Sequence, residues 1–251
     1  MKDLTIIIPV KEYDESIDNM LAEAIKSCKD NKIILVGKNV TKFEEKNSLK
    51  NLSVIENENS DCTYQENVGK ALESVNTEYF SVLEYDDRFS DIWIDAFEEY
   101  LGFENEEIFG YLPLTEIIDF VEKRSIGYAN EAFWASSFSE RIGFLDIESM
   151  TEYLSFNTSG AIFKTKDFID LGGLKKSMKL VFWYEFLLRS LYNGKKIFVV
   201  PKVGYFHVVN RDGSLSSEYG KTISEEEADW WVDLAKKEYF FKNDRNKKYG
   251  E

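Results

Sequence analysis

The chain has 251 residues, which is enough for one large domain or two small ones. Its 31 Lys and Arg against 46 Asp and Glu give a net charge of −15, which disfavours non-specific binding to nucleic acid or anionic membranes. Two cysteines and one histidine exclude a disulfide framework and a four-cysteine zinc site. The longest near-apolar stretches, 4–10 and 197–203, are too short to span a membrane, and no secretion leader is recognised, so we expect a cytoplasmic protein.

The first 85 residues alternate between apolar strands and amphipathic helices. The β-branched run Leu4–Val10 predicts a strand that is buried on both faces, as in a parallel sheet. Helical spacing of apolar residues predicts helices over 14–28 and 64–75, and further apolar runs predict strands over 32–36, 52–55 and 79–83. This order predicts an α/β fold, an open mixed and mostly parallel sheet flanked by helices, of the doubly wound, Rossmann-like type.

The remaining residues continue the pattern with weaker signals. We expect helices over 91–101, 167–171 and 183–192, strands over 108–112, 159–163 and 196–200, and an irregular aromatic stretch over 115–153. Ser224–Glu227 reads as a capping box that opens a C-terminal helix. Because no repeat or linker divides the chain, we expect a single domain over 1–216 and a helical appendage over 217–251.

Three carboxylates stand in the four residues Glu84-Tyr85-Asp86-Asp87, directly after the fourth predicted strand. In open α/β sheets, ligands bind beyond the carboxyl ends of the strands. Carboxylates this close raise one another's pKa values, and a divalent cation such as Mg²⁺ or Mn²⁺ would relieve the repulsion. The alternative is a solvated acidic turn in which Asp87 caps the helix near Ser90.

The strand Thr5–Val10 and the segments Glu66–Gly69 and Tyr79–Asp87 follow one another in an order that resembles family 2 glycosyltransferases of the GT-A fold. Thr5–Val10 resembles the opening strand of that family. Glu66–Gly69 and Tyr79–Asp87 look like its asparagine-glycine helix start and its D-x-D strand. Further matching segments follow in the family's order, namely Ser159–Phe163, Leu171–Gly173, Leu188–Arg189, Gly194, Pro201, Tyr205–His207 and Arg211–Ser216. The resemblance covers roughly 3–100 and 157–216, and about 102–156 is then the expected acceptor-side insertion.

The resemblance implies a metal-dependent, inverting, hexosyltransferase-like enzyme that moves a sugar from a nucleotide-diphosphate sugar, with UDP expected, to a hydroxyl of a saccharide, protein or modified nucleobase. The residues it implies for donor binding are Pro9, Val10, Glu12, Asn67, Glu84, Tyr85, Asp86, Arg211 and Ser214. Mn²⁺ or Mg²⁺ would be held by Asp86 and His207. For His207, the only histidine, the alternative is an ordinary core or surface imidazole.

The sequence departs from the family pattern at two places. Where the family has the aspartate of a Glu-Asp pair, Trp183 stands, and the nearest acid, Glu185, is the predicted catalytic base. Glu185 and Arg189 are spaced i, i+4, so the alternative is a surface salt bridge. In that case the next candidates are Asp119, Glu131 and Asp146. Gly37, followed by Lys38, stands where the family often has an aspartate for the nucleotide base.

Two other functions stay open on these residues. The two departures favour a degenerate protein that binds a sugar nucleotide without turnover. A viral-type glycosyltransferase acting on hydroxylated DNA bases would suit the Lys-, Asn- and Glu-rich composition, but the charge of −15 argues against a DNA substrate.

Overall fold

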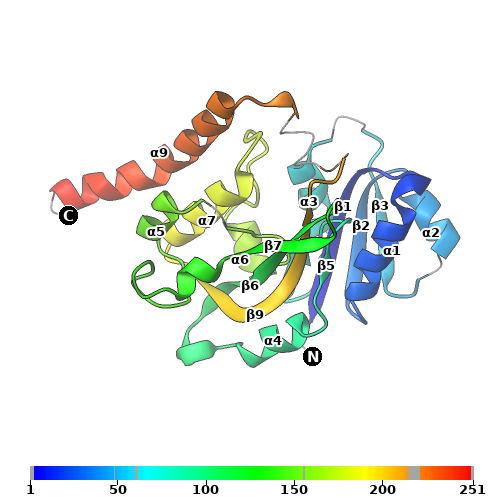
Figure 1. The fold of residues 1–251 in the computed structure, drawn as a ribbon, viewed down its shortest axis with the longest axis horizontal. Helices are drawn as coiled ribbons and strands as arrows, with labels where there is room; N and C mark the ends of the chain where they lie inside the picture. Colours follow the sequence, from blue (N-terminus) through cyan, green and yellow to red (C-terminus); the bar gives the residue numbers. More distant parts are fainter. Residues whose placement is uncertain are drawn as a thin grey trace.

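One mixed sheet runs through the molecule, with helices on both faces (Figure 1). The structure is a computed structural model that describes residues 3–47, 49–59, 62–154, 156–212, 214 and 221–249. Within these residues, nine strands form the sheet in the order β3-β2-β1-β4-β8-β6-β9-β5, and β7 pairs with β6. The predicted α/β class and the mostly parallel sheet are therefore confirmed.

The parallel half of the sheet follows the prediction closely. It consists of β1 (Leu4–Glu12), β2 (Lys32–Lys38), β3 (Leu52–Glu56) and β4 (Tyr79–Val82). Ile6 and Ile8 face one apolar cluster and Ile7 faces another, and all three are fully buried. Because both faces of β1 are covered, its apolar residues run continuously instead of alternating with polar ones.

Helices cover each cluster. Those on the cluster of Ile6 are α1 (Asp18–Ser27), α2 (Thr41–Asn47) and α4 (Trp93–Glu99). Those on the cluster of Ile7 are α3 (Tyr64–Leu72), α5 (Ile147–Glu152), α6 (Thr165–Asp170) and α7 (Phe182–Tyr192). Short 3₁₀ helices lie at Glu15–Ile17, Phe103–Asn105 and Glu131–Trp134. The short helix α2, which has one buried apolar residue, Phe43, was not predicted.

The other half of the sheet corrects two predictions. The strand expected at 108–112 continues as β6 (Ile108–Asp119) and turns back as β7 (Arg124–Ala129), so the stretch 115–153 is not wholly irregular. The strand expected at 196–200 continues as β9 (Lys196–Val209), parallel to β6. Short antiparallel strands β5 (Arg88–Phe89) and β8 (Ile162–Lys164) complete this half.

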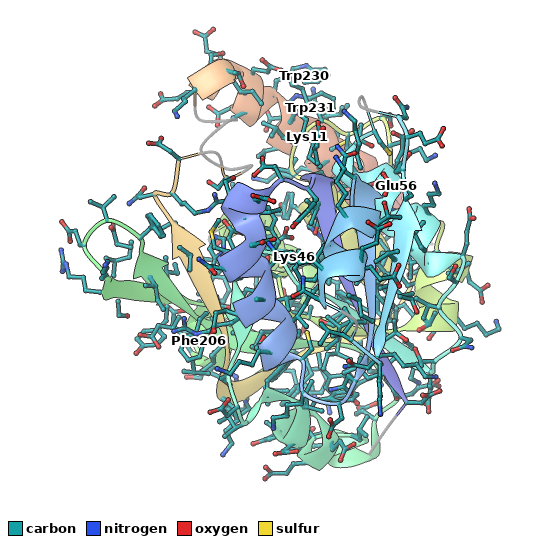
Figure 2. All side chains as sticks on the ribbon, turned by 90° about the vertical axis from the view of Figure 1, so that its right-hand side faces the viewer. Lys11, Lys46, Glu56, Phe206, Trp230 and Trp231 are labelled. Carbon is teal, nitrogen blue, oxygen red and sulfur yellow. The ribbon has the colours of Figure 1, made fainter. Side chains whose placement is uncertain are left out.

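The C-terminal helix α9 (Glu225–Tyr249) projects from the body of the molecule (Figure 1). Its first turns pack on the layer of α5 and α7, where Ala235 is 2% exposed, whereas Trp230 on its outer face is 55% exposed (Figure 2). Among the described helices, none has the length and apolar character needed to cross a membrane.

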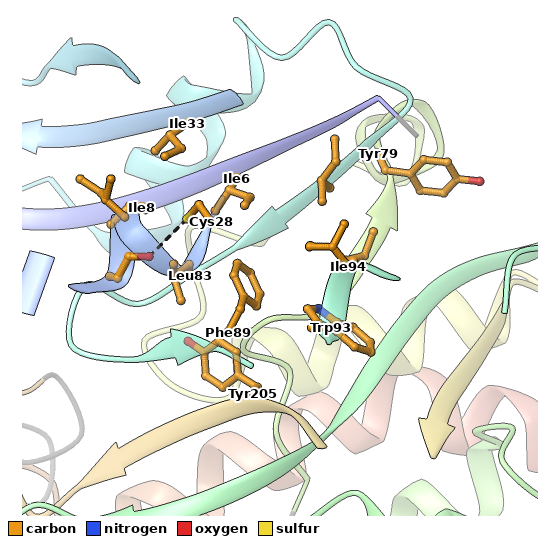
Figure 3. Close-up of a cluster of buried hydrophobic side chains, with 14 of the residues drawn as sticks. Ile6, Ile8, Cys28, Ile33, Tyr79, Leu83, Phe89, Trp93, Ile94 and Tyr205 are labelled. Carbon is orange, nitrogen blue, oxygen red and sulfur yellow. Dashed lines mark hydrogen bonds between the residues drawn. The ribbon is translucent and has the colours of Figure 1, made fainter. Parts of the chain in front are cut away.

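Tyr205 brings β9 against the end of β4 (Figure 3). Its ring lies 5.7 Å from that of Phe89, and both are buried beside Trp93. Gly160 has φ +75°, and a Cβ there would lie 2.3 Å from the Tyr205 ring, so only glycine allows this approach. The close packing places the second half of β9 over the acidic turn that follows β4.

Candidate functional site

The four residues after β4 and Leu83 form a tight turn. The amide of Asp87 donates to the carbonyl of Glu84 over 3.1 Å. The hydroxyl of Tyr205 accepts the Glu84 N–H at 3.2 Å and donates to Asp87 Oδ2 at 2.9 Å, so it joins the two ends of the turn. Burial and the charges of Asp87 and Glu84 raise the pKa of Tyr205 well above its ordinary value, so the hydroxyl keeps its proton.

Asp87 faces inward. Its side chain is 1% exposed and accepts three hydrogen bonds, from Tyr205 Oη at 2.9 Å, from His207 Nδ1 at 2.9 Å and from the backbone N–H of Val208 at 2.7 Å. The helix that follows, α4, has no side-chain cap, so the alternative in which Asp87 caps it is wrong. Sequence reasoning missed this function of Asp87 because all three donors lie on β9, about 120 residues away along the chain.

His207 lies next to the acidic turn, and its side chain is 26% exposed. Burial lowers the pKa of His207, but the hydrogen bond to Asp87 and the charges of Asp87, Glu84 and Asp86 act in the opposite direction and leave the pKa raised. The ring is therefore neither a solitary core imidazole nor a free surface one, because it belongs to the acidic turn.

Arg211 reaches the same turn from beyond the end of β9. Its Nε donates to Asp86 Oδ2 at 2.8 Å and its Nη2 to Tyr85 Oη at 2.6 Å, while its guanidinium lies 5.1 Å from the centre of the Tyr85 ring. The side chains of Arg211 and Asp86 are 8% and 10% exposed. Burial and the charge of Asp87 raise the pKa of Asp86, although Arg211 opposes the shift. The amide of Ser214, a buried residue, donates to the carbonyl of Arg211.

Glu84 is the most strongly perturbed acid of the turn. Burial, followed by the charges of Asp87 and Asp86, raises its pKa to about 8, even though Tyr64 stabilises the carboxylate by donating a hydrogen bond of 2.6 Å. The indole of Trp183 lies within hydrogen-bonding reach of the same tyrosine hydroxyl. Tyr64 and Trp183 belong to α3 and α7, so two helices close over this end of the turn.

A second group of site residues lies at the carboxyl ends of β1 and β2. Asn67, 2% exposed, donates to the carbonyl of Val10 at 3.3 Å and accepts from the side chain of Asn57 at 2.9 Å. A Cβ at Gly37 would lie 1.9 Å from the Val10 carbonyl oxygen, so no side chain fits there. The aspartate that the family often has at this position is therefore sterically excluded in this chain. Asn57 was not predicted from the sequence.

The end of β1 borders a cavity of about 400 Å³. Pro9 is buried within the strand, and Glu12, exposed at its end, is 3.0 Å from Lys38 Nζ and accepts from Asn39 Nδ2 at 2.8 Å. The cavity is lined by Glu12, Tyr13, Asp14, Glu15, Asn39, Lys42 and Lys46. Figure 2 shows Lys46 on the side of the sheet that α1 and α2 cover.

Glu185 is buried on α7, where it is 1% exposed. Its Oε2 lies 2.9 Å from Arg189 Nη2 and its Oε1 2.9 Å from Lys175 Nζ. Arg189 also donates to the carbonyls of Leu171 and Gly173. The i, i+4 pair considered from the sequence is thus present, but it is buried and tied to the loop that follows α6.

The three other candidate bases have different surroundings. Asp119 accepts from the amides of Val121 and Glu122 and from the side chain of Asn210 at the turn between β6 and β7. Asp146 caps the start of α5. Glu131 is exposed in the 3₁₀ helix that it begins.

The acidic turn offers few protein ligands for a cation. Within the described residues, no three His, Cys, Asp or Glu side chains gather as a metal-binding group. Asp86 and His207 flank Asp87, and Mg²⁺ in nucleotide sites is commonly bound by one or two side chains while phosphate oxygens and waters complete its shell. A carboxylate oxygen together with an imidazole nitrogen also suits Mn²⁺.

Neither a protein-family model nor a curated protein sequence matches the chain. Among solved structures, S. aureus TarS 1-349 superposes with a TM-score of 0.62 at 15% identity, covering 93% of this chain and 78% of that one. The chain has the TarS fold. This similarity confirms the GT-A type of fold that the sequence resemblance implied.

Further TarS structures match, including one in complex with UDP that has a TM-score of 0.62 at 15% identity. TarS 1-349 in complex with UDP-GlcNAc gives a TM-score of 0.62 at 16% identity, covering 85% of this chain and 60% of that one. S. aureus TarS itself gives 0.60 at 13% identity and covers 90% of this chain and 46% of that one. The chain therefore spans about half the length of TarS, and at these identities the similarity is one of fold.

Proposed function

We propose that the chain is a glycosyltransferase that moves a sugar from a UDP-sugar to a hydroxyl acceptor, with inversion at the anomeric carbon. The convergence of Asp86, His207 and Arg211 beyond the carboxyl end of β4 carries this proposal, because it puts an anion-binding guanidinium beside oxygen and nitrogen ligands. The fold shared with a protein crystallised with UDP-GlcNAc and with UDP supports it.

In the proposed reaction the acceptor oxygen bonds to the anomeric carbon while the bond from that carbon to the diphosphate breaks. The electron pair of the broken bond leaves on the diphosphate oxygen, and the acceptor proton passes to a carboxylate. Asp86 and His207 would hold Mn²⁺ or Mg²⁺, and a cation bound there would offset the negative charge on the leaving diphosphate. Arg211 changes partner from Asp86 to the diphosphate and adds a second positive charge.

The remaining predicted donor residues surround the nucleotide in this proposal. Val10 and Asn67, with Pro9 and Glu12 on the same strand end, hold the base and ribose, and Glu84 and Tyr85 contact the ribose from the acidic turn. Ser214 lies on the segment expected to cover the diphosphate. Glu185 is the base proposed from the sequence, although both of its oxygens already hold cations.

Calorimetry with UDP and Mn²⁺ tests the donor site. We expect metal-dependent binding by the native chain and its loss in Asp86→Ala, with circular dichroism unchanged. Asp170→Asn, which removes an exposed carboxylate on α6, is the control and should bind normally. Unchanged metal-dependent affinity in Asp86→Ala would remove Asp86 from the proposed cation site, and the absence of UDP binding by the native chain would overturn the function.

A second candidate is a protein that binds sugar nucleotides without turnover. Trp183 favours it, because its indole stacks on Phe163 at 5.8 Å and 12° where the family keeps an acid. Incubation of the native chain with UDP-sugars and Mn²⁺ separates the two candidates. Release of UDP supports the enzyme, whereas tight binding without release over many hours supports the binding protein.

A further inference from the structure

We propose that Asp87 is a positioning residue that fixes the His207 ring in the tautomer whose Nε2 carries the lone pair, ready for the donor's cation. The proposal rests on the function proposed above. It explains why the two adjacent aspartates have different roles. Asp86 contacts the ligand, and Asp87 orients the imidazole of His207.

The hydrogen bonds of Asp87 determine the tautomer. Asp87 Oδ2 accepts hydrogen bonds from Tyr205 Oη and His207 Nδ1, each at 2.9 Å. Asp87 Oδ1 accepts one from the Val208 N–H at 2.7 Å. A carboxylate only accepts hydrogen bonds, so Nδ1 must carry the proton. In a neutral ring the lone pair is then on Nε2, which within the described residues makes no hydrogen bond to the protein. Carboxylate–imidazole pairs of this kind orient histidine ligands at metal sites.

The strand geometry makes the arrangement rigid. Tyr205 and His207 are two residues apart on β9, so their side chains leave the same face and reach the same carboxylate oxygen. The backbone N–H of Val208, the residue after His207, donates to Asp87 Oδ1. Asp87 therefore bonds both to the His207 ring and to the backbone of the strand that carries it. Tyr205 is in turn fixed by its packing on Gly160 and by its bond to the Glu84 amide.

The two aspartates are separated by their surroundings. The Asp87 side chain is 1% exposed and accepts its hydrogen bonds from β9, whereas the Asp86 side chain is 10% exposed and pairs with the guanidinium of Arg211. Loss of the Asp87 charge should therefore loosen His207 and leave the Asp86–Arg211 ion pair in place.

Because the chain has one histidine, nitrogen NMR of histidine-labelled protein reports this ring alone. On the alkaline side of the titration seen in the ring's own nitrogen shifts, we expect a protonated Nδ1 and an unprotonated Nε2 in the metal-free native chain. In Asp87→Asn the amide offers Nδ1 a weaker acceptor, and we expect a mixture of tautomers. A native ring protonated on Nε2 would overturn the proposal. Should Asp87→Asn not fold, the native spectrum still decides the tautomer.

Calorimetry supplies the second readout. Asp87→Asn should weaken Mn²⁺-dependent UDP binding about 10–100-fold, as expected for loss of a carboxylate behind a metal-bound histidine. Asp167→Asn is the control, because Asp167 is a half-buried aspartate of α6 that pairs with Lys195, and this variant should bind UDP normally. Unchanged affinity in a folded Asp87→Asn would overturn the positioning role, whereas failure of the native chain to bind UDP overturns the proposed function and leaves the NMR result standing.

Discussion

Glu185→Gln separates the two functions considered for this residue. If Glu185 serves structure, its loss leaves Arg189, whose side chain is 11% exposed, without a counter-charge on a buried face of α7. Breaking a buried ion pair by removing one partner costs roughly 3–5 kcal/mol. In the variant the Arg189 guanidinium can still donate hydrogen bonds to the carbonyls of Leu171 and Gly173. The loss of stability should therefore lie at the lower end of that range. We expect a loss of about 3 kcal/mol in the free energy of unfolding.

Urea unfolding followed by tryptophan fluorescence measures this loss, and a UDP-release assay below the unfolding range measures turnover. The matched control is Asp170→Asn, which removes the acid of another i, i+4 pair, Lys166–Asp170, whose side chains are 87% and 58% exposed. That exposed pair should contribute no more than about 0.5 kcal/mol.

The opposite result would refute the structural assignment. In that result, Glu185→Gln would unfold at the same urea midpoint as the native chain and bind UDP normally, but turn over roughly 10²–10⁴-fold more slowly. Such a variant would identify Glu185 as the base. The ion pair with Arg189 would then orient the catalytic carboxylate.

Two further predictions concern the ligand-free protein. Because the pKa of Glu84 is about 8 in the folded chain and its ordinary value is 4.5, the folded state holds the extra proton between these values. The native free energy of unfolding should thus fall as pH rises from about 5 to 8, by roughly 3–4 kcal/mol from Glu84 alone, and Glu84→Gln should remove this part and leave only the smaller decline from the raised pKa of His207; parallel curves from urea titrations in chelator would contradict it. Gly37→Ala should lose roughly 1–3 kcal/mol because its Cβ meets the Val10 carbonyl, whereas Gly69→Ala, where nothing lies within 4 Å, should not be destabilising; equal melting temperatures for the two variants would refute the steric argument.

The parallel half of the fold was predictable because its signals are local. Leu4–Val10 is apolar throughout, and such a run has few alternatives to a doubly covered strand. The hairpin of β6 and β7 gave no such signal. Ile117 and Ile118 flank a register shift, which breaks the alternation by which a strand is recognised in sequence.

The candidate site was likewise predictable only in part. Asp86, His207 and Arg211 were found because they match a motif in order along the chain, and the structure brings them to one turn. Asp87 and Tyr205 were missed as partners because their interaction depends on β9 crossing the end of β4. The surroundings of Glu185 were also beyond sequence reasoning, since spacing alone does not distinguish a buried pair from a surface one.

The ion pair between Arg211 and Asp86 gives the acidic turn a resident cation. A cation that binds there must therefore replace the Arg211 guanidinium, which already neutralises the carboxylate of Asp86. A metal ion alone would have to displace Arg211 into solvent, whereas a metal ion that arrives with a diphosphate offers the displaced guanidinium a new anion. The arrangement therefore couples the two binding events thermodynamically, so that on the proposed function each of the two ligands raises the affinity for the other.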